Sequence, residues 1–361
     1  MRERLEASSF VLLPAVYNGL TARIAEHVGF DALYMSGGAT ALGLGLPDVG
    51  LTSLTEVTNN IRHIAEVTDL PLIADADTGF GNPVSVRRTV REYERAGAAG
   101  LHLEDQAFPK KCGYLEGKEV IDADEFVQKL QAALEARINP ETIIIARTDA
   151  LQVHGWDEVE ARVSAYYEAG ADVVFVDGIH RNEIETYVDR VVSRGMPTLY
   201  NGTELSAAEA EAHGFAMQIQ AVAIYASYRA EYTALEHLRK TGSRAEVPAG
   251  QQGVPPFTDV VGLPRVYELE ARHGLEQKEN AQDRAWDEAF ARLVGYVERE
   301  GTSVVPAEHL EEGFALGAWV ATQRALSHEI GGRGAVLTPA RRRALAELSG
   351  WDWGGQPPRS G

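Results

Sequence analysis

Short apolar runs alternate with amphipathic segments through the first two thirds of the chain. The segments between the runs repeat apolar positions at helical spacing, as in Leu54–Val67, Pro83–Arg95, Ala123–Arg137 and Trp156–Glu168. The runs themselves are continuously apolar, which is typical of buried parallel strands. They are Val11–Ala15, Ala32–Met35, Leu72–Asp75, Leu101–Glu104, Ile143–Arg147, Val173–Asp177, Thr198–Asn201 and Ala216–Ile219. Eight strand–helix units predict an α/β fold, a (β/α)8 TIM-type barrel. A doubly wound open sheet is the alternative, but no Gly-x-Gly-x-x-Gly follows the first run.

Polar residues stand at the carboxyl ends of six predicted strands in succession. They are Ser36-Gly37-Gly38, Asp75 and Asp77, Glu104-Asp105, Arg147-Thr148-Asp149, Asp177 and Asn201. Any one of them could be an ordinary turn or cap residue. Because barrel active sites lie at this end of the strands, their recurrence predicts an active site there.

The stretch Ala-Asp-Ala-Asp-Thr-Gly-Phe-Gly, residues 74–81, carries the most specific chemistry. Strand alternation would point the side chains of Asp75 and Asp77 the same way. Two adjacent carboxylates repel one another, and a hard divalent ion with oxygen ligands removes that repulsion. The pair therefore predicts a Mg²⁺ site, with Mn²⁺ as the alternative ion. A turn and helix cap made by the two aspartates is the simpler interpretation of the motif alone.

The segment Gln106–Val120 is long for a connection between a strand and a helix. It contains Lys110, Lys111, Cys112, Gly113, Tyr114, Gly117 and Lys118. Glycine hinges, lysines and a thiol in one loop indicate a lid that closes over a bound anion. A buried, inert thiol is the alternative for Cys112.

Composition limits the function classes. The chain has 361 residues, 45% of them hydrophobic, and a formal net charge of −19, which disfavours general nucleic-acid binding. A single cysteine excludes an internal disulfide and suits a reducing compartment. Met1–Ser9 is charged, with no apolar signal region after it, and no apolar run is long enough to span a bilayer. We therefore expect a cytoplasmic protein.

Four motifs resemble those of the isocitrate lyase/phosphoenolpyruvate mutase superfamily, in the same order and spacing. They are SGGATALGLGLPDVG (36–50), ADADTGFG (74–81), GLHLEDQAFPKKCGYLEGKEV (100–120) and ARTDA (146–150), within a resemblance that runs from about Phe10 to His273. The resemblance implies a Mg²⁺-dependent barrel that acts on 2-oxo- or 2-hydroxycarboxylates through an enolate-like intermediate. Lys-Lys-Cys-Gly resembles the carbon–carbon lyase branch, which includes methylisocitrate and alkylmalate lyases. There are three alternatives. The first is a phosphonomutase of the phosphoenolpyruvate or carboxyphosphoenolpyruvate type, and the second is a hydrolase or decarboxylase of oxaloacetate or another 2-oxo acid. The third is a barrel that serves only as a binding or scaffold protein.

The resemblance also implies roles for individual residues. Asp75 and Asp77 would hold the metal, with Glu104 reaching it through water and Asp48 close by. Ser36, Gly37 and Gly38 would cradle the substrate, a small carboxylate, which Gly113, Tyr114, Asn201 and Thr203 would also contact. Arg147 would pair with a substrate carboxylate, and Lys110 would stabilise the enolate. Tyr34 or a water on the metal would take the hydroxyl proton, and Cys112 would protonate the departing carbanion.

Two positions depart from the family pattern. Tyr114 stands where the family has histidine, and Asp177 stands where the lyases have glutamate. No arginine clearly matches those that bind the additional carboxylate of tricarboxylates, since Arg229 is a poor match. These differences favour a malate-like dicarboxylate substrate.

The remainder of the chain predicts a separate helical module. Thr241–Pro256 has the composition of a linker, and the resemblance implies that the helix Pro264–His273 is exchanged with a neighbouring subunit in a dimer or tetramer. Residues 280–353 resemble the helicase-associated domain, a small all-α domain. Residues 281–361 contain nine Arg, no Lys and eleven Asp plus Glu, so the net charge of 9 − 11 = −2 favours a structural or protein-contact role over nucleic-acid binding. We predict a barrel domain at 1–275, a helical domain at 280–353 and a disordered tail at 354–361.

Overall fold

The computed structural model describes residues 1–113, 115, 117–243, 255–273, 281–326, 337 and 339–353. It divides into two compact units, Met1–Arg239 and Lys240–Gly361. Tyr114 and the predicted tail 354–361 lie outside the described residues.

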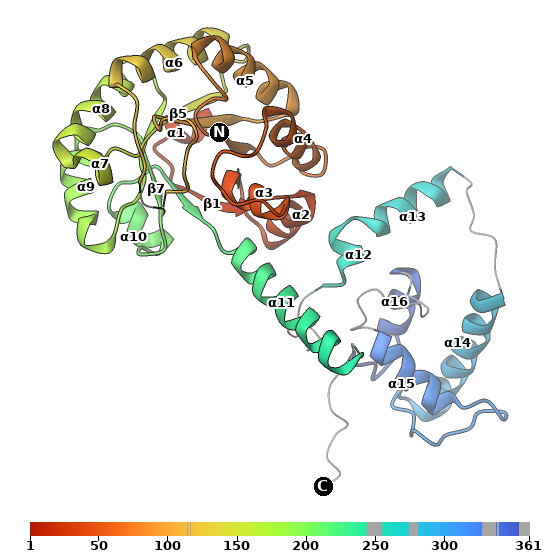
Figure 1. Cartoon of the computed structure of the whole chain (residues 1–361). Helices are drawn as coiled ribbons and strands as arrows, with labels where there is room; N and C mark the ends of the chain where they lie inside the picture. Colours follow the sequence, from red (N-terminus) through yellow and green to blue (C-terminus); the bar gives the residue numbers. More distant parts are fainter. Residues whose placement is uncertain are drawn as a thin grey trace. The chain divides into compact units, whose positions relative to one another are not determined.

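Eight parallel strands form a closed barrel in the first unit (Figure 1). The strands are β1 (Val11–Val16), β2 (Leu33–Met35), β3 (Leu72–Asp75), β4 (Gly100–Glu104), β5 (Ile143–Thr148), β6 (Val173–Val176), β7 (Thr198–Asn201) and β8 (Met217–Gln220). Their order around the barrel is their order in the sequence, and β1 closes the barrel by pairing with β8, for example through Val11 and Met217. The predicted (β/α)8 barrel is confirmed.

Helices surround the barrel and begin at residues able to cap them. Asn82 accepts hydrogen bonds from the first turn of α5 (Pro83–Ala96), and Ser53 forms a reciprocal capping box with Glu56 at the start of α4 (Leu54–Ala65). Gly29 and Gly97 end α2 (Gly19–Val28) and α5 in the left-handed conformation, which only glycine adopts without a steric penalty. The helices of this unit are α1 (Arg2–Glu6), α2 (Gly19–Val28), α3 (Gly37–Gly43), α4 (Leu54–Ala65), α5 (Pro83–Ala96), α6 (Ala123–Ala136), α7 (Leu151–His154), α8 (Trp156–Glu168), α9 (Ile184–Arg190), α10 (Ala207–Ala212) and α11 (Ala223–Thr241), with 3₁₀ turns η1 (Arg181–Glu183) and η2 (Val192–Arg194).

The apolar core has two layers. Side chains such as Leu13, Ile73 and Ile145 fill the barrel interior. Others, such as Ile61 and Phe126, are buried between the sheet and the helices. Each such side chain contributes about 1.5–3 kcal/mol by leaving water. This rigid scaffold holds the strand ends, and with them the polar residues, in fixed positions.

The second unit is helical and has its own core. It contains α12 (Phe257–Val260), α13 (Leu263–Arg272), α14 (Ala281–Glu300), α15 (Leu316–Leu326) and α16 (Pro339–Ala346). Trp286 stacks on Phe290 and donates a 2.9 Å hydrogen bond to Gln323, while Leu293 and Tyr296 are buried on the same side of α14. These four residues stand at i, i+4, i+7 and i+10, so they form one face of the helix. None of the helices described has both the length and the apolar character needed to cross a membrane.

Candidate active site

The polar residues predicted at the strand ends lie at one end of the barrel. Asp75 and Glu104 are the last residues of β3 and β4, and Arg147 is one residue before the end of β5. Asp177 directly follows β6, and Asn201 ends β7. The first four are buried, which is unusual for charged groups unless they are paired or bind a ligand.

Asp75 is held by groups from β2 and α3. Its Oδ2 accepts hydrogen bonds from Gly37 N (3.1 Å) and from the Tyr34 hydroxyl (3.3 Å). A Cβ on Gly37 would lie 2.6 Å from that oxygen, so only glycine allows this close approach. Ser36 caps α3 by accepting a bond from Ala39 N. The motif at 36–38 thus packs against Asp75 through Gly37.

Asp77 reaches the site by a different route from the one expected. β3 ends at Asp75, and Asp77 lies in a turn with φ of 46°, so strand alternation does not apply to it. Instead its backbone N donates a 2.9 Å hydrogen bond to Asp75 Oδ1. Burial and the charge of Asp75 raise the pKa of Asp77 to about 6. Burial also opposes ionisation of Asp75, but His102, Lys110 and Arg147 outweigh it and lower its pKa to about 2.

Lys110 supplies the positive charge next to this pair. Its Nζ lies 2.8 Å from Asp77 Oδ1 and 2.5 Å from Asp48 Oδ1. Burial disfavours the ammonium form, but Asp77 and the other carboxylates outweigh this effect and raise the pKa of Lys110. Asp48 in turn lies against Gly38, where a Cβ would be 3.0 Å from its Oδ2. The lid lysine is therefore bound to the predicted metal-binding edge.

Glu104 provides a test of whether these residues fit a cation. It is fully buried, and neither of its carboxylate oxygens has a hydrogen-bond partner among the described residues. Arg147 Nε lies 3.4 Å from Oε2, yet burial raises the pKa of Glu104 well above its usual value. No three His, Cys, Asp or Glu side chains in the described part of the chain form a ready-made metal site. Mg²⁺ needs only one or two carboxylates and keeps several waters, so this all-oxygen donor set fits it.

Arg147 joins acids at the ends of three strands, since it lies near Glu104, Asp149 and Asp177. Its Nε and Nη2 form a two-point ion pair with Asp149, at 2.8 and 3.0 Å, and Nη2 lies 3.0 Å from Asp177 Oδ2. Asn201 donates a 3.1 Å bond to the other oxygen of Asp177. The guanidinium also lies over the ring of Phe175, 5.3 Å from its centroid. Arg147, Asp177 and Asn201 are thus brought together, whereas Thr203, two residues past β7, is exposed.

The loop Gln106–Val120 closes against this cluster. Its base is joined by the bridge between Gln106 and Val120, and Cys112 N donates to Asp48 O at 3.1 Å. A Cβ on Gly113 would lie 1.7 Å from Asp177 Oδ2, so the backbone at Gly113 rests directly on that carboxylate. Cys112 is half-buried beside it. The loop therefore covers the strand-end cluster and places a thiol next to it.

His102 is a site residue to which the sequence patterns assigned no role. It is fully buried on β4, with Nε2 2.7 Å from the Tyr34 hydroxyl and 3.3 Å from Asp75 Oδ1. Burial lowers the pKa of His102, and burial together with Asp75 raises that of Tyr34 well above its usual value. The available signal was its spacing: His102 and Glu104 are two apart on one strand, so they point to the same side of the sheet.

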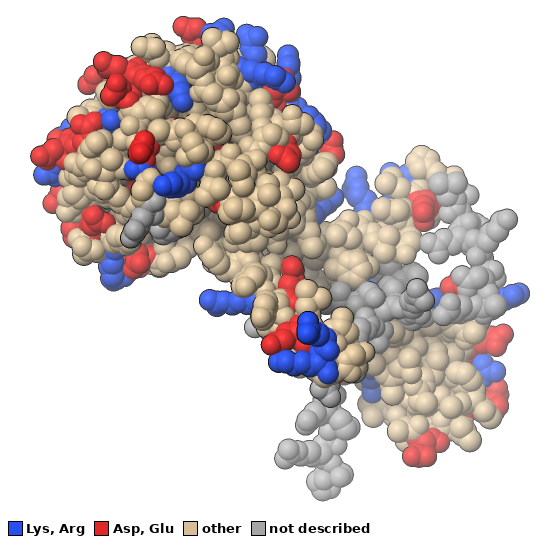
Figure 2. Space-filling model, in the orientation of Figure 1, with Lys and Arg blue, Asp and Glu red and all other residues tan. Residues whose placement is uncertain are grey.

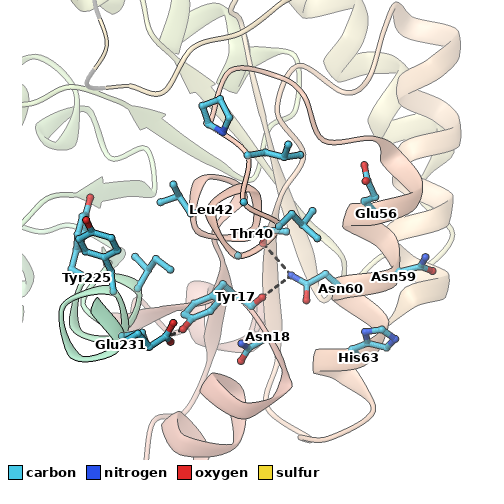
Figure 3. Close-up of a pocket in the computed structure, with 18 residues that line it drawn as sticks. Tyr17, Asn18, Thr40, Leu42, Glu56, Asn59, Asn60, His63, Tyr225 and Glu231 are labelled. Atoms are coloured by element: carbon cyan, nitrogen blue, oxygen red, sulfur yellow. Dashed lines mark hydrogen bonds between the residues drawn. The ribbon is translucent and has the colours of Figure 1, made fainter. Parts of the chain in front are cut away.

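A cavity of about 1190 Å³ lies elsewhere on the first unit, between α3, α4 and α11 (Figure 3). Its wall includes Tyr17, Leu42, Asn60, Tyr225 and Tyr228, and none of the predicted site residues. Asn60 donates 3.0 Å hydrogen bonds to Tyr17 O and Thr40 Oγ1. The cavity is mainly apolar and carries none of the acid–base groups described above.

Fold and site together define a (β/α)8 barrel with an acidic, cation-balanced site under a thiol-bearing lid. Comparison with known proteins agrees. A family model described as phosphoenolpyruvate phosphomutase matches residues 1–240. The chain is 41% identical over 278 residues to the 2,3-dimethylmalate lyase of Eubacterium barkeri, covering 75% of this chain and 96% of the relative. The chain therefore belongs to the isocitrate lyase/phosphoenolpyruvate mutase superfamily.

Two further matches extend this result. The 2-methylisocitrate lyase of Aeropyrum pernix is 36% identical over 300 residues, covering 81% of this chain and 93% of that protein. The crystal structure of phosphonopyruvate hydrolase in complex with oxalate and Mg²⁺ matches with a TM-score of 0.68 and 31% identity, over 75% of this chain and 96% of that one. The superfamily and the lyase class of enzyme predicted from the motifs are confirmed. A model described as helicase associated domain matches residues 283–354, as the C-terminal resemblance predicted.

Proposed function

We propose that this protein is a Mg²⁺-dependent carbon–carbon lyase that cleaves an alkylmalate-like 2-hydroxycarboxylate into a 2-oxo acid and a second acid. The observation that carries the proposal is the closure of the Cys112–Gly113 segment onto Asp177, beside the buried acids of β3 and β4. The sequence relatives named as dimethylmalate and methylisocitrate lyases support the same reaction class.

Asp75, Asp77 and Glu104 are the residues that would hold the ion, with Mn²⁺ as an alternative to Mg²⁺. When bound, such an ion makes a 2-hydroxyl group more acidic and neutralises the adjacent carboxylate. Burial raises the pKa values of Asp77 and Glu104 in the protein alone. A bound ion would supply positive charge next to these carboxylates and so favour their ionised forms. Ser36, Gly37 and Gly38 line the side of the site next to Asp75 and Asp48.

The remaining residues handle protons and charge. The Tyr34 hydroxyl accepts the substrate's hydroxyl proton as it passes its own to His102 Nε2, 2.7 Å away. The oxygen's electron pair forms the new C=O bond, the bond between C2 and C3 breaks, and its electron pair remains on C3, conjugated with the C3 carboxylate. Arg147 and Lys110 stabilise that negative charge. The Cys112 thiol then gives its proton to C3 and becomes a thiolate.

The ion pairs of Arg147 bear on the number of carboxylates that the substrate carries. Arg147 already carries ion pairs to Asp149 and Asp177, which limits it to a single additional carboxylate. This supports a malate-like dicarboxylate over a tricarboxylate.

The function is tested by incubating the protein with Mg²⁺ and 2,3-dimethylmalate, other alkylmalates, 2-methylisocitrate, oxaloacetate or phosphonopyruvate, and following the products by mass. We expect release of a 2-oxo acid from an alkylmalate. Turnover of oxaloacetate or phosphonopyruvate alone would instead favour a hydrolase, decarboxylase or mutase. Binding without turnover of any member of the panel would favour a scaffold role.

We further propose a cytoplasmic homo-oligomer in which α13 is exchanged between subunits. No residue of α12 or α13 is buried, and Phe257, Val261, Val266 and Leu269 are exposed large hydrophobic residues. α11 likewise exposes Tyr225, Tyr228, Tyr232, Leu235 and Leu238, next to the apolar cavity of Figure 3. Exposed apolar surface of this kind favours association. Light scattering after size exclusion should give a dimer or tetramer, and a monomer would contradict the proposal.

For residues 280–353 we propose a structural or protein-contact role, as a domain separate from the barrel domain at 1–275. Several of its described arginines are engaged within the domain: Arg299 pairs with Glu311, Arg341 lies over Trp286, and Arg342 lies over Trp353. Figure 2, which draws the whole chain, shows Lys and Arg side chains mixed with Asp and Glu side chains on the face in view. Nucleic-acid binding needs clustered positive charge. Anisotropy titrations with labelled DNA and RNA should therefore show no binding at physiological salt.

A further inference from the structure

Lys118 lies inside the lid and is almost fully buried, with 2% of its side chain exposed. It stands two residues before Val120, whose bridge to Gln106 fixes the base of the loop. Ala107 N also donates to Glu119 O at 2.8 Å. The backbone beside Lys118 is therefore anchored to the barrel, while its side chain points into the loop.

The Lys118 ammonium joins the loop segment at Gly113 to the acid that follows β5. Its Nζ donates to the carbonyl of Gly113 at 2.8 Å and to Asp149 Oδ1 at 3.0 Å. The Gly113 carbonyl belongs to the segment that carries Cys112, and Asp149 is the fully buried partner of Arg147. Since an ammonium loses its hydration when it is buried, both bonds are needed to compensate for that loss.

We propose that Lys118 is a positioning residue: it holds the Cys112 segment closed through the Gly113 carbonyl and couples this closure to Arg147 through their shared partner Asp149. The inference rests on the proposed function, in which Cys112 protonates the carbanion that Arg147 stabilises. A proton donor misplaced by about 1 Å loses on the order of 10² in rate. One lysine bonded to both sides of the site supplies the geometry that this transfer needs.

Lys111 offers a matched control. Its Nζ also donates to a carbonyl of the same loop, that of Gly117, at 2.6 Å. Of the two lysines, Lys118 is the one bonded to Asp149. Lys118→Met and Lys111→Met therefore make the same chemical change in the same loop, and only the first removes the connection to Arg147.

The experiment measures turnover, Mg²⁺ affinity and the reactivity of Cys112 toward iodoacetamide, with and without oxalate plus Mg²⁺, in the full-length protein. We expect Lys118→Met to lower kcat by about 10²-fold, with Mg²⁺ affinity unchanged. Oxalate should slow alkylation in the wild type and in Lys111→Met but not in Lys118→Met. Lys118→Arg, which keeps a donor, should recover part of that protection.

Wild-type turnover and protection in Lys118→Met would overturn the proposal, as would an equal loss in Lys111→Met or the absence of oxalate protection in the wild type. The alkylation measurement needs no turnover. If the wild type cleaves no 2-hydroxycarboxylate while oxalate protects it and not Lys118→Met, the positioning role stands and the lyase proposal fails.

Discussion

Lys110 Nζ lies 2.8 Å from Asp77 Oδ1, so a lid cation contacts one of the two aspartates proposed to hold the metal. The same ammonium is 2.5 Å from Asp48 Oδ1. Within the protein alone, Lys110 is thus a cation in direct contact with the acid pair, through Asp77. A divalent ion at Asp77 would compete with it.

Replacing Lys110 with methionine should therefore separate metal binding from turnover. Loss of the ammonium removes a positive charge that repels the incoming ion, and we expect Mg²⁺ to bind at least about fivefold more tightly, a change of about 1 kcal/mol. Turnover should fall by at least about 10²-fold because the enolate loses a stabilising charge. Isothermal titration and a product assay measure the two effects, and weaker Mg²⁺ binding would show that Lys110 helps to build the metal site.

Mg²⁺ affinity should depend on pH through Asp77. Its pKa in the folded protein is raised to about 6, so the carboxyl keeps its proton to a higher pH than an ordinary aspartate. Below that pH the proton must leave before the ion binds, and the affinity should fall by about tenfold per pH unit. Above it the affinity should level off. Mg²⁺ titrations from pH 5 to 8 test this dependence. A dissociation constant that stays the same over the whole range would refute the role of Asp77.

Gly113→Ala should prevent closure of the lid without unfolding the barrel. The added Cβ would lie 1.7 Å from Asp177 Oδ2, which forces the loop outward. We expect turnover to drop by at least about 10²-fold because Cys112 no longer reaches the substrate. Thermal unfolding should be close to wild type, since Gly113 lies outside the apolar core of the barrel. Normal turnover would mean that the closed lid is not the active arrangement.

Cys112→Ser should leave Mg²⁺ and product binding intact and reduce turnover by at least about 10²-fold. The hydroxyl of serine is a far weaker acid than a thiol, so it cannot protonate the carbanion at a useful rate. Product formation under saturating substrate is the measurement. Near-normal turnover would remove Cys112 from the mechanism.

The sequence predicted the barrel well because its strands are buried on both faces and read as continuous apolar runs. β3 and β7 match the predicted ranges, and β4 differs only by one residue at its start, Gly100. α8 agrees at both ends, since its boundaries fall at glycine-bearing turns. By contrast, α11 (Ala223–Thr241) has no buried residue, so no apolar face marks in the sequence where it begins.

The position of the site could be predicted from the sequence, but the hydrogen bonds and ion pairs within it could not. Strand-end position identified Asp75, Glu104 and Arg147, since that inference needs only the strand direction. His102 and the pairing of Asp149 with Arg147 were missed, because a polar residue within an apolar run gives no sign of its partner. The turn that brings Asp77 back to Asp75 depends on a left-handed φ at a residue other than glycine, which the sequence does not reveal.

The proposed metal site is tested by calorimetric titration of the metal-free protein with Mg²⁺ at pH 7.5, in the wild type and in Asp77→Asn. We expect one ion bound per subunit in the wild type, and binding weakened beyond detection in the variant, which keeps its fold by thermal unfolding. Absence of Mg²⁺ binding in the wild type, or equal binding in Asp77→Asn, would contradict it.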